Sequence, residues 1–598
     1  MCFQVTPFLD AIPRVEALRH IAALGVAPLL PSMRRPLATN PKPLNADRSL
    51  TAIEHTTALV GDDLTPLADA TILIDGERIA AVGAGGTINV PPNASRIDAR
   101  GTHAIPGLCD AHIHFFQSGG LYTRPDTIDL RAVRPYTDEL AWIKSSLTNT
   151  FARYLRAGIT SVADVGGPFW NYDVRALAQR TPVAPRVVVA GPLLSSVSRE
   201  ILDPLGDPPI VKIDTFEEAK ALVDRQLAQQ TDFIKFWWVV LPDRPAKAFE
   251  PVARRAIDYA HNHGARVIIH AVELETARLA VESGADILAH SVFDTDVDDA
   301  FVELLRSNKT IYTPTLNVIG NYGYTFHGKP NLTSYDLRVA DADVVATLFQ
   351  LQDVESALPA AEIAAIRARR APEPPHAAMR NLKKVHDAGV RIAAGTDAGN
   401  IGTQHASSLY DELITMVESG LSTRDVLKTA TQGGAALMNH SADLGMIAAG
   451  KRADITLLER DPLADIRAVS AVRYVVKGGV AYEAASLLNE SAEDVVQRQA
   501  NAFNYHDTQV FTEMYAPHAQ MRRDGKVIAS TRAQIQAYYA QRFRKYPALH
   551  TEIISRDVRG STIVDKQRVT GIGDKPETAT IIFTVADGAI LEADISTG

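Results

Sequence analysis

Short apolar runs alternate with segments of helical periodicity between residues 106 and 435. Strands that are buried on both faces read as continuous apolar runs, and eight such strands separated by helices are typical of a (β/α)8 TIM barrel. The pattern therefore predicts an α/β fold of this type, with a doubly wound parallel sheet as the alternative. The expected strands are Leu108–His112, Ile159–Ala163, Arg186–Ala190, Phe233–Trp237, Arg266–His270, Ile287–His290, Thr310–Thr313 and Val390–Ala394.

The segments on both sides of this region have strand and turn patterns instead. Ala70–Gly83 contains two apolar arms around a turn, which is a hairpin signal, and Val472–Val476 is a second apolar strand followed by glycines. We expect residues 46–105 and 440–486 to form one β-sandwich domain beside a barrel that covers residues 106–439.

Two segments extend beyond the barrel and this sandwich. Residues 325–380 form an insertion rich in Ala, Arg and Pro, with a helix expected near Ala360–Arg370, and could serve as a lid or pocket wall. Residues 490–598 predict a separate α+β domain, with amphipathic helices at Glu493–Phe503 and Arg532–Tyr546 before a final run of strands.

The first 45 residues contain one short apolar run, Ile21–Leu30, and are expected to lie outside the fold. A signal peptide and a true start at Met33 are both open. A cytoplasmic location is expected, and a secreted or periplasmic one follows if the leader is a signal. No stretch reaches the roughly 18 apolar residues of a membrane span, so none is predicted.

Composition excludes several classes of protein. The chain of 598 residues has a formal charge of -9 and no long basic run, which argues against a nucleic-acid partner. Its two cysteines, Cys2 and Cys109, exclude a disulfide scaffold and a zinc site built from cysteine.

A His-x-His motif ends the first expected barrel strand. Residues two apart on a strand point to the same side, so His112 and His114 would project together into the barrel and could share a metal ion. A second copy, His261 and His263, precedes Gly264 at an expected helix end, where solvated side chains are the better interpretation.

Lys235 lies inside an apolar strand, where an unpaired ammonium group is costly. One explanation is a salt bridge. The other is a depressed pKa, which would free the amine to react with carbon dioxide and form a carbamate. A carbamate is anionic and has two oxygens, so it could bridge two metal ions.

Three more potential ligands follow expected strands. His270 ends the fifth strand and His290 the sixth, and Asp397 follows the eighth, although it could instead be a turn or N-cap residue. Strand ends on one face define the active site of a barrel. Nitrogen and oxygen ligands suit Zn²⁺, with Mn²⁺, Co²⁺ or Ni²⁺ as alternatives.

Polar residues elsewhere are weaker candidates. Asn400, Gln404 and His405 follow the eighth strand and could touch substrate or be ordinary loop residues. His506 and Asp507 in the C-terminal domain could line a pocket, although a turn is the preferred interpretation.

The motifs Pro106–His114, Gly395–Asp397 and Leu444–Ile455, with the six potential ligands in this order, resemble the amidohydrolase superfamily. The most similar branch contains imidazolonepropionase-like and Xaa-Pro dipeptidase-like enzymes. The run Ile234–Trp238 departs from the Ile-Lys-Ile-Met pattern of several dipeptidases in this branch, so the substrate stays open. Residues 490–598 resemble nuclear transport factor 2-like, or SnoaL-like, domains.

The resemblance implies a binuclear site with a flanking β-sandwich. His112, His114 and Asp397 would hold one metal, His270 and His290 the other, and carboxylated Lys235 would bridge them. Metal-activated hydroxide would attack a carbonyl, and Asp397 would carry the proton to the leaving amine.

The leading hypothesis is hydrolysis of an amide C–N bond in a dipeptide or N-acyl amino acid, by a homo-oligomer. Hydrolysis of a cyclic amide, lactone or phosphotriester on the same site is one alternative. A non-catalytic small-molecule-binding or assembly protein is the alternative from another class.

Overall fold

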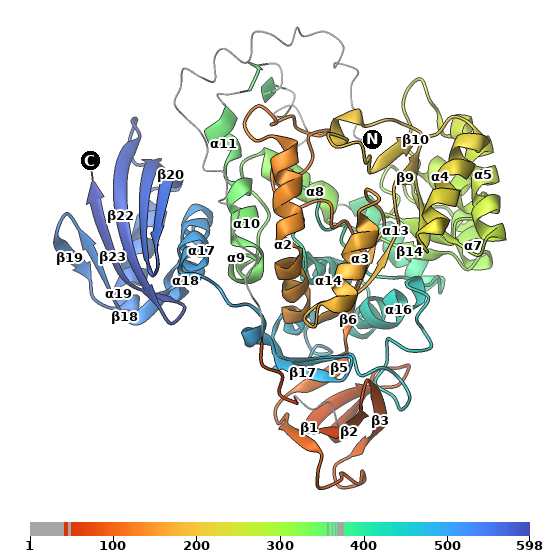
Figure 1. The fold of residues 1–598 in the computed structure, drawn as a ribbon, viewed down its shortest axis with the longest axis horizontal. Helices are drawn as coiled ribbons and strands as arrows, with labels where there is room; N and C mark the ends of the chain where they lie inside the picture. Colours follow the sequence, from red (N-terminus) through yellow and green to blue (C-terminus); the bar gives the residue numbers. More distant parts are fainter. Residues whose placement is uncertain are drawn as a thin grey trace.

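The computed structural model describes residues 41–45, 50–355, 358–360, 363–364, 366 and 376–597. Figure 1 shows a central α/β body, a sheet below it and a C-terminal domain at its side. Residues 1–40 of the predicted leader and most of the helix predicted near Ala360–Arg370 lie outside the described residues.

Parallel strands form the centre of the α/β body. Two sheets, β6-β7-β8 and β10-β9-β11-β12-β13-β14, are joined by a parallel bridge between Ala190 and Phe233. Seven of the expected strands are confirmed, and β9 and β10 are additional. The bounds are β6 (Leu108–Ile113), β7 (Ile159–Asp164), β8 (Arg186–Val189), β9 (Leu193–Ser195), β10 (Ile210–Lys212), β11 (Phe233–Trp237), β12 (Arg266–His270), β13 (Ile287–Ala289) and β14 (Ile311–Thr313).

The eighth expected strand, Val390–Ala394, is present only as isolated bridges. Ile392 pairs in parallel with Tyr312 on β14, and Ala398 pairs in parallel with Ile113 on β6. The segment between them therefore connects the last parallel strand to the first and closes the ring. Its pairing is irregular because Gly395 approaches β6 so closely that an added Cβ would lie 2.7 Å from the Cβ of His112.

Helices cover the outside of these strands, as the alternating pattern predicts (Figure 1). None of the helices in the described ranges is long and apolar enough to cross a membrane. The helices are α2 (Tyr136–Arg156), α3 (Asn171–Arg180), α4 (Phe216–Ala228), α5 (Ala246–Asn262), α6 (Leu274–Glu282), α7 (Asp299–Ser307), α13 (His376–Asp387), α14 (Ser408–Glu418), α15 (Thr423–Lys428), a π-helical turn (Thr429–Gly433) and α16 (Gly434–Leu437).

The two flanks of the α/β body share one eight-stranded sheet, because β15 pairs antiparallel with β5. Asn45, assigned to the leader from sequence, is buried and its side chain accepts the Ala481 amide at 2.9 Å, so residue 45 packs against this sheet. The strands are β1 (Leu50–Val60), β2 (Thr65–Asp75), β3 (Arg78–Ala84), β4 (Ser95–Asp98), β5 (His103–Pro106), β15 (Ile455–Leu458), β16 (Val472–Lys477) and β17 (Val480–Glu483).

A helical insertion follows β14. Its second and third helices begin with side-chain caps at Thr333 and Asp341, which bind the free amides of the first helical turn. The apolar faces of these helices are buried. The helices are α8 (Val318–Phe326), α9 (Ser334–Val339), α10 (Ala342–Leu348) and α11 (Leu351–Val354).

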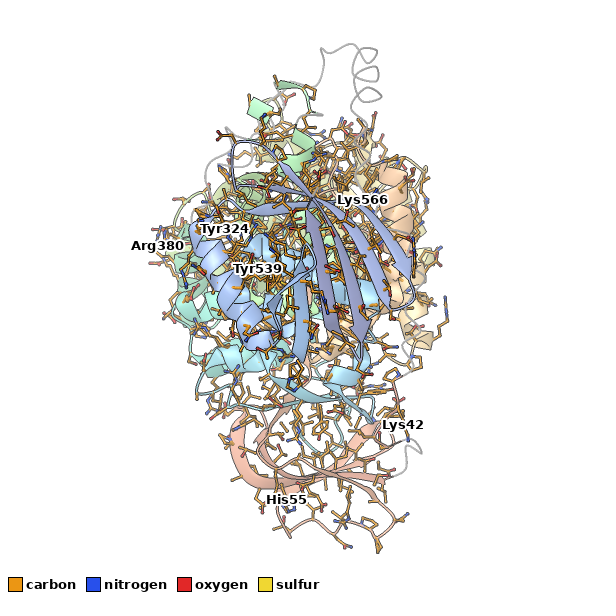
Figure 2. The ribbon with its side chains drawn as sticks, turned by 90° about the vertical axis from the view of Figure 1, so that its left-hand side faces the viewer. Lys42, His55, Tyr324, Arg380, Tyr539 and Lys566 are labelled. Atoms are coloured by element: carbon orange, nitrogen blue, oxygen red, sulfur yellow. The ribbon has the colours of Figure 1, made fainter. Side chains whose placement is uncertain are left out.

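The C-terminal domain packs three helices on a six-stranded sheet in the order β19-β18-β23-β22-β21-β20. Figure 2 looks onto this sheet, with Lys566 on its exposed side and Tyr539 on α19. Phe511, Ile563 and Phe583 are buried between the layers. The elements are α17 (Ala492–Tyr505), α18 (Thr508–Glu513), α19 (Arg532–Lys545), β18 (Tyr515–Arg523), β19 (Lys526–Ala529), β20 (His550–Arg559), β21 (Thr562–Thr570), β22 (Glu577–Ala586) and β23 (Ala589–Thr597).

Candidate metal centre

Three of the six predicted ligands meet at the ends of the parallel strands. His112 on β6, His290 directly after β13 and Asp397 before the closing bridge each offer one ligand atom, and these atoms lie within 4.8 Å of one another. His114 Nε2 lies 3.1 Å from Asp397 Oδ1, and His112 Nε2 lies 3.4 Å from the same oxygen.

The two remaining predicted ligands, His270 and Lys235, lie against this group. The ring centroid of His270, at the end of β12, lies 4.4 Å from that of His290, whose ring is 4.9 Å from His112. Lys235 on β11 is 1% exposed; its charge helps to lower the pKa of His112 and His270, and the Asp397 carboxylate acts to raise the pKa of Lys235. The fold thus brings the whole predicted set together.

Hydrogen bonds orient two of the imidazole rings. His114 Nδ1 lies 2.7 Å from the Gly166 carbonyl, which can only accept, so this nitrogen carries the proton and Nε2 has a free lone pair. His290 Nδ1 lies 2.6 Å from Thr315 Oγ1, and when this hydroxyl accepts the bond the Nε2 of His290 is available in the same way. Rings held like this are prepared to bind a metal through Nε2.

Three buried polar atoms in the centre lack a hydrogen-bond partner within the described part of the chain: His112 Nε2, Lys235 Nζ and Asp397 Oδ1. Such atoms are rare in folded proteins because leaving one unpaired costs about 1–3 kcal/mol. A group of nitrogen and oxygen ligands is the donor set that Zn²⁺ and similar cations prefer, so the residues fit a divalent metal site.

The protonation states suit metal ligands as well. Burial lowers the pKa of Lys235 to about 7 and that of His290 to about 3, and it holds the pKa of His112 and His270 well below the usual value. Burial opposes ionisation of Asp397, but the neighbouring imidazoles of His112 and His114 lower its pKa well below the ordinary value. Neutral imidazoles and a carboxylate are the metal-binding forms.

The backbone is strained at two of these residues. His290 has φ 77° and Asp397 has φ 62°, in the left-handed region that residues other than glycine rarely adopt. Each such conformation costs about 1–3 kcal/mol and clusters at functional sites. The strain at both strand ends turns the side chains toward one centre.

Two buried carboxyl groups that sequence reasoning missed support the strand ends. Asp110 accepts the Thr396 hydroxyl at 2.7 Å, and burial raises its pKa to about 7. Asp164 accepts the Phe115 amide at 3.0 Å, and burial raises its pKa to about 7 as well. They fix the residues next to His114 and Asp397.

Arg124 is a further residue that the sequence did not single out. Its guanidinium donates to Asn400 Oδ1 at 2.6 Å and forms two bonds of 2.7 Å with Asp126. Asn400 in turn donates to the Asp397 carbonyl at 2.9 Å. Arg199 lies 3.8 Å from Asp126, so two guanidinium groups share this carboxylate beside the centre. No motif marks Arg124 because it lies in an irregular loop.

The other predicted site residues are placed differently. Both ring nitrogens of His405 are bound inside the protein, at 2.8 Å from Tyr154 Oη and 2.8 Å from the Gln117 carbonyl, and Gln404 binds the Gly119 carbonyl at 3.1 Å. This geometry favours a packing role for both side chains. Asn400 alone of the three borders the centre.

The second His-x-His copy lies apart from the centre, as expected. His261 and His263 are exposed at the end of α5, where His261 Nε2 lies 2.9 Å from Asp286. In the C-terminal domain, His506 ends α17 in a left-handed conformation and Asp507 caps α18. Both residues therefore lie in a turn between two helices, the interpretation that the sequence favoured over a pocket.

Comparison with known proteins identifies the family to which the chain belongs. The profile of the Amidohydrolase family matches residues 104–481, and that of the SnoaL-like domain matches residues 496–593. The chain belongs to the amidohydrolase family and carries a C-terminal SnoaL-like domain.

Individual relatives are more distant. Imidazolonepropionase from Streptomyces coelicolor is 25% identical over 432 residues, which cover 69% of this chain and 93% of that protein. Imidazolonepropionase from Mycolicibacterium smegmatis is 24% identical over 71% of this chain and 90% of its own. A Xaa-Pro dipeptidase with bound methionine has TM-score 0.54 and 22% identity, over 73% of this chain and 100% of the other. Molinate hydrolase has TM-score 0.55 and 20% identity, over 73% and 96%. The structural likenesses show a shared fold.

Proposed function

We propose that the protein is a binuclear metal-dependent hydrolase of amide C–N bonds outside the polypeptide backbone of proteins, acting on a dipeptide or an N-acyl amino acid. The observation that carries this proposal is the set of unpaired, buried atoms of His112, Lys235 and Asp397 at the strand ends. A non-catalytic scaffold would gain stability by replacing them with apolar side chains.

Two divalent cations, Zn²⁺ by preference, fit this donor set. His112, His114 and Asp397 would hold one, His270 and His290 the other, and the carbamate of Lys235 would bridge them. When bound, these cations supply Lewis acidity and lower the pKa of water.

The chain's own residues supply the remaining steps. The depressed pKa of Lys235 keeps part of the amine neutral near pH 7, which carbamate formation requires. Asp397 lies beside His112 and His114 as a carboxylate and would accept the proton of the attacking water, then pass it to the leaving nitrogen. Asn400 fixes the backbone of Asp397.

The surroundings of the centre favour a substrate with a carboxylate. Arg124 and Arg199 together exceed the charge of Asp126, so this side of the centre attracts an anion. The Arg199 guanidinium lies 5.2 Å above the ring of Trp237, whose centroid is 6.0 Å from that of His270. A dipeptide or N-acyl amino acid places its carboxylate a few bonds from the scissile amide. The carboxylate could therefore bind on the side of these guanidinium groups while the amide lies at the centre.

The imidazolonepropionase relatives favour a second candidate, hydrolysis of a cyclic amide. Their name denotes an imidazolone ring with a propionate side chain, and this combination also carries a carboxylate.

We retain residues 46–105 with 440–486, 106–439 and 490–598 as the proposed domain division.

A substrate screen on metal-loaded protein tests the proposal. Xaa-Pro and other dipeptides, N-acyl amino acids, cyclic amides, lactones and phosphotriesters are compared, and each active amide is repeated with its carboxylate converted to a primary amide. We expect turnover of an amide that falls sharply when the carboxylate is removed. Turnover confined to lactones or phosphotriesters would contradict the assignment.

A further inference from the structure

The C-terminal domain is packed directly against the helical insertion that follows β14. Figure 1 shows α17 and α18 beside α9 and α10. The contact is apolar at its centre: Leu337 and Val345 of the insertion belong to the same buried cluster as Val496 and Phe511 of the C-terminal domain. Separating the two parts would expose this cluster to water.

Hydrogen bonds and one ion pair fix the orientation of this contact. Arg338 on α9 donates to both carboxylate oxygens of Glu513 on α18, at 2.6 and 3.0 Å. Asn501 on α17 donates to the Ala342 carbonyl at the start of α10, at 2.7 Å. Bidentate geometry restrains both side chains.

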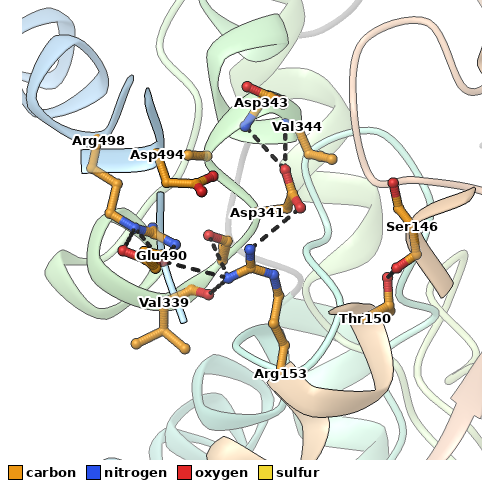
Figure 3. Close-up of polar contacts among 12 residues, drawn as sticks. Ser146, Thr150, Arg153, Val339, Asp341, Asp343, Val344, Glu490, Asp494 and Arg498 are labelled. Atoms are coloured by element: carbon orange, nitrogen blue, oxygen red, sulfur yellow. Dashed lines mark hydrogen bonds and ion pairs between the residues drawn. The ribbon is translucent and has the colours of Figure 1, made fainter. Parts of the chain in front are cut away.

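A buried network connects the same contact to the barrel (Figure 3). Arg153 on α2 donates to the Val339 carbonyl at 2.6 Å and lies 3.4 Å from Asp341. Glu490 lies 4.0 Å from Arg153 and binds Arg498 on α17, which donates to the insertion as well. Barrel, insertion and C-terminal domain thus meet at two buried guanidinium groups.

The insertion in turn holds the loop that borders the metal centre. Thr347 on α10 accepts the Leu121 amide at 2.9 Å, and Gln350 accepts the Tyr122 hydroxyl at 2.9 Å. This loop continues to Arg124, which binds Asn400 at 2.6 Å beside Asp397. A continuous path of contacts therefore runs from α17 to the centre.

We propose that the C-terminal SnoaL-like domain is a positioning element for the substrate-binding wall. Its docked helices α17 and α18 hold α9 and α10, which hold residues 121–124 and so set the place of Arg124. Arg338 and Glu513 act through other residues and are positioning residues. This inference rests on the proposed function, because it assigns the wall to that substrate site.

Charge reversal of the pair tests the proposal in the full-length, metal-loaded protein. Arg338→Glu and Glu513→Arg each place like charges together, and the double variant restores the pair. Arg522→Glu is the matched control, because Arg522 pairs with Glu592 at 3.0 Å with similar exposure on strands of the same domain, outside the docked helices. Asn501→Ala is a second variant of the contact that introduces no repulsion.

Amide hydrogen exchange and steady-state kinetics are the two readouts. We expect faster exchange in α10 and in Leu121–Leu130 for each single variant and for Asn501→Ala. KM should rise about fivefold or more, the lower end of coupling between sites, while kcat changes less. The double variant should restore both readouts, and the control should change neither.

Native exchange in Leu121–Leu130 together with native KM in all single variants would overturn the inference. Exchange is measured without substrate, so a protein that hydrolyses nothing in the screen still shows whether docking orders this loop. A failure of the proposed function is thereby distinguished from a failure of the positioning role.

Discussion

The amine of Lys235 is buried among imidazoles and a carboxylate, and its pKa is lowered to about 7 by burial. Sequence reasoning predicted the unusual position of this lysine, because a charged residue inside an apolar strand needs a physical reason. It could not predict the support by Asp110 and Asp164 or the place of Arg124. Those roles depend on loops and strand ends that meet only in the folded chain.

Replacing Lys235 with Ala should lower kcat/KM by about 100-fold or more, the upper range for losing support of a metal site. Bound metal should fall with it, because the bridging ligand is lost. Added acetate or propionate should restore part of the activity by supplying a carboxylate in the vacated space. Lys212→Ala, at an exposed lysine paired with Asp214, serves as control. Full activity of the Lys235 variant would disprove the carbamate bridge.

His261 gives a residue-scale prediction for pH. Its bond with Asp286 raises its folded-state pKa, so the pair stabilises the fold at pH below the unfolded value and loses this contribution as pH rises through the raised pKa. His261→Gln should therefore lower the free energy of unfolding, measured by urea denaturation, more at pH 5.5 than at pH 8.5. The loss should be less than about 1 kcal/mol because the pair is partly exposed. Metal content should not change. An equal loss at both pH values, or lost metal, would contradict the surface assignment.

At the scale of elements, the continuous apolar runs predicted seven of the parallel strands, because burial on both faces leaves a clear pattern. The eighth was predicted as a regular strand, but the structure has isolated bridges at Ile392 and Ala398 instead. In this segment Gly395 lies against His112 and Asp397 adopts a left-handed conformation. The local apolar pattern of the sequence does not predict such a close approach of two backbone segments.

Gly395→Ala tests this close approach. The added Cβ would lie 2.7 Å from His112 Cβ and 2.8 Å from His112 N, so β6 or the closing segment must move. We expect a loss of about 1–3 kcal/mol in unfolding free energy, as for other overpacked sites, together with weaker metal binding. Gly320→Ala is the control, because its Cβ would meet only Tyr324 at 3.7 Å. Native stability and metal affinity in Gly395→Ala would contradict this account of the closing segment.

At the scale of the whole molecule, the sequence predicted the two flanks of the α/β body and the C-terminal α+β domain as units. The packing of α17 and α18 on α9 and α10 was not predictable, because it joins Arg338 to Glu513 and Asn501 to Ala342 across long separations in the chain. Neither partner carries a motif that names the other. In our proposal this docking lets the C-terminal domain position the wall of the substrate site through the insertion.

Metal content of the protein purified without added metal or chelator tests the central claim most directly. Elemental analysis should give about two divalent cations per chain, as expected for a two-metal hydrolytic site, and removal by a chelator should be reversed by Zn²⁺ or Mn²⁺ with bicarbonate. Fewer than about one cation per chain, with no uptake of added Zn²⁺ or Mn²⁺, would contradict a metal centre at His112, His114, Lys235, His270, His290 and Asp397.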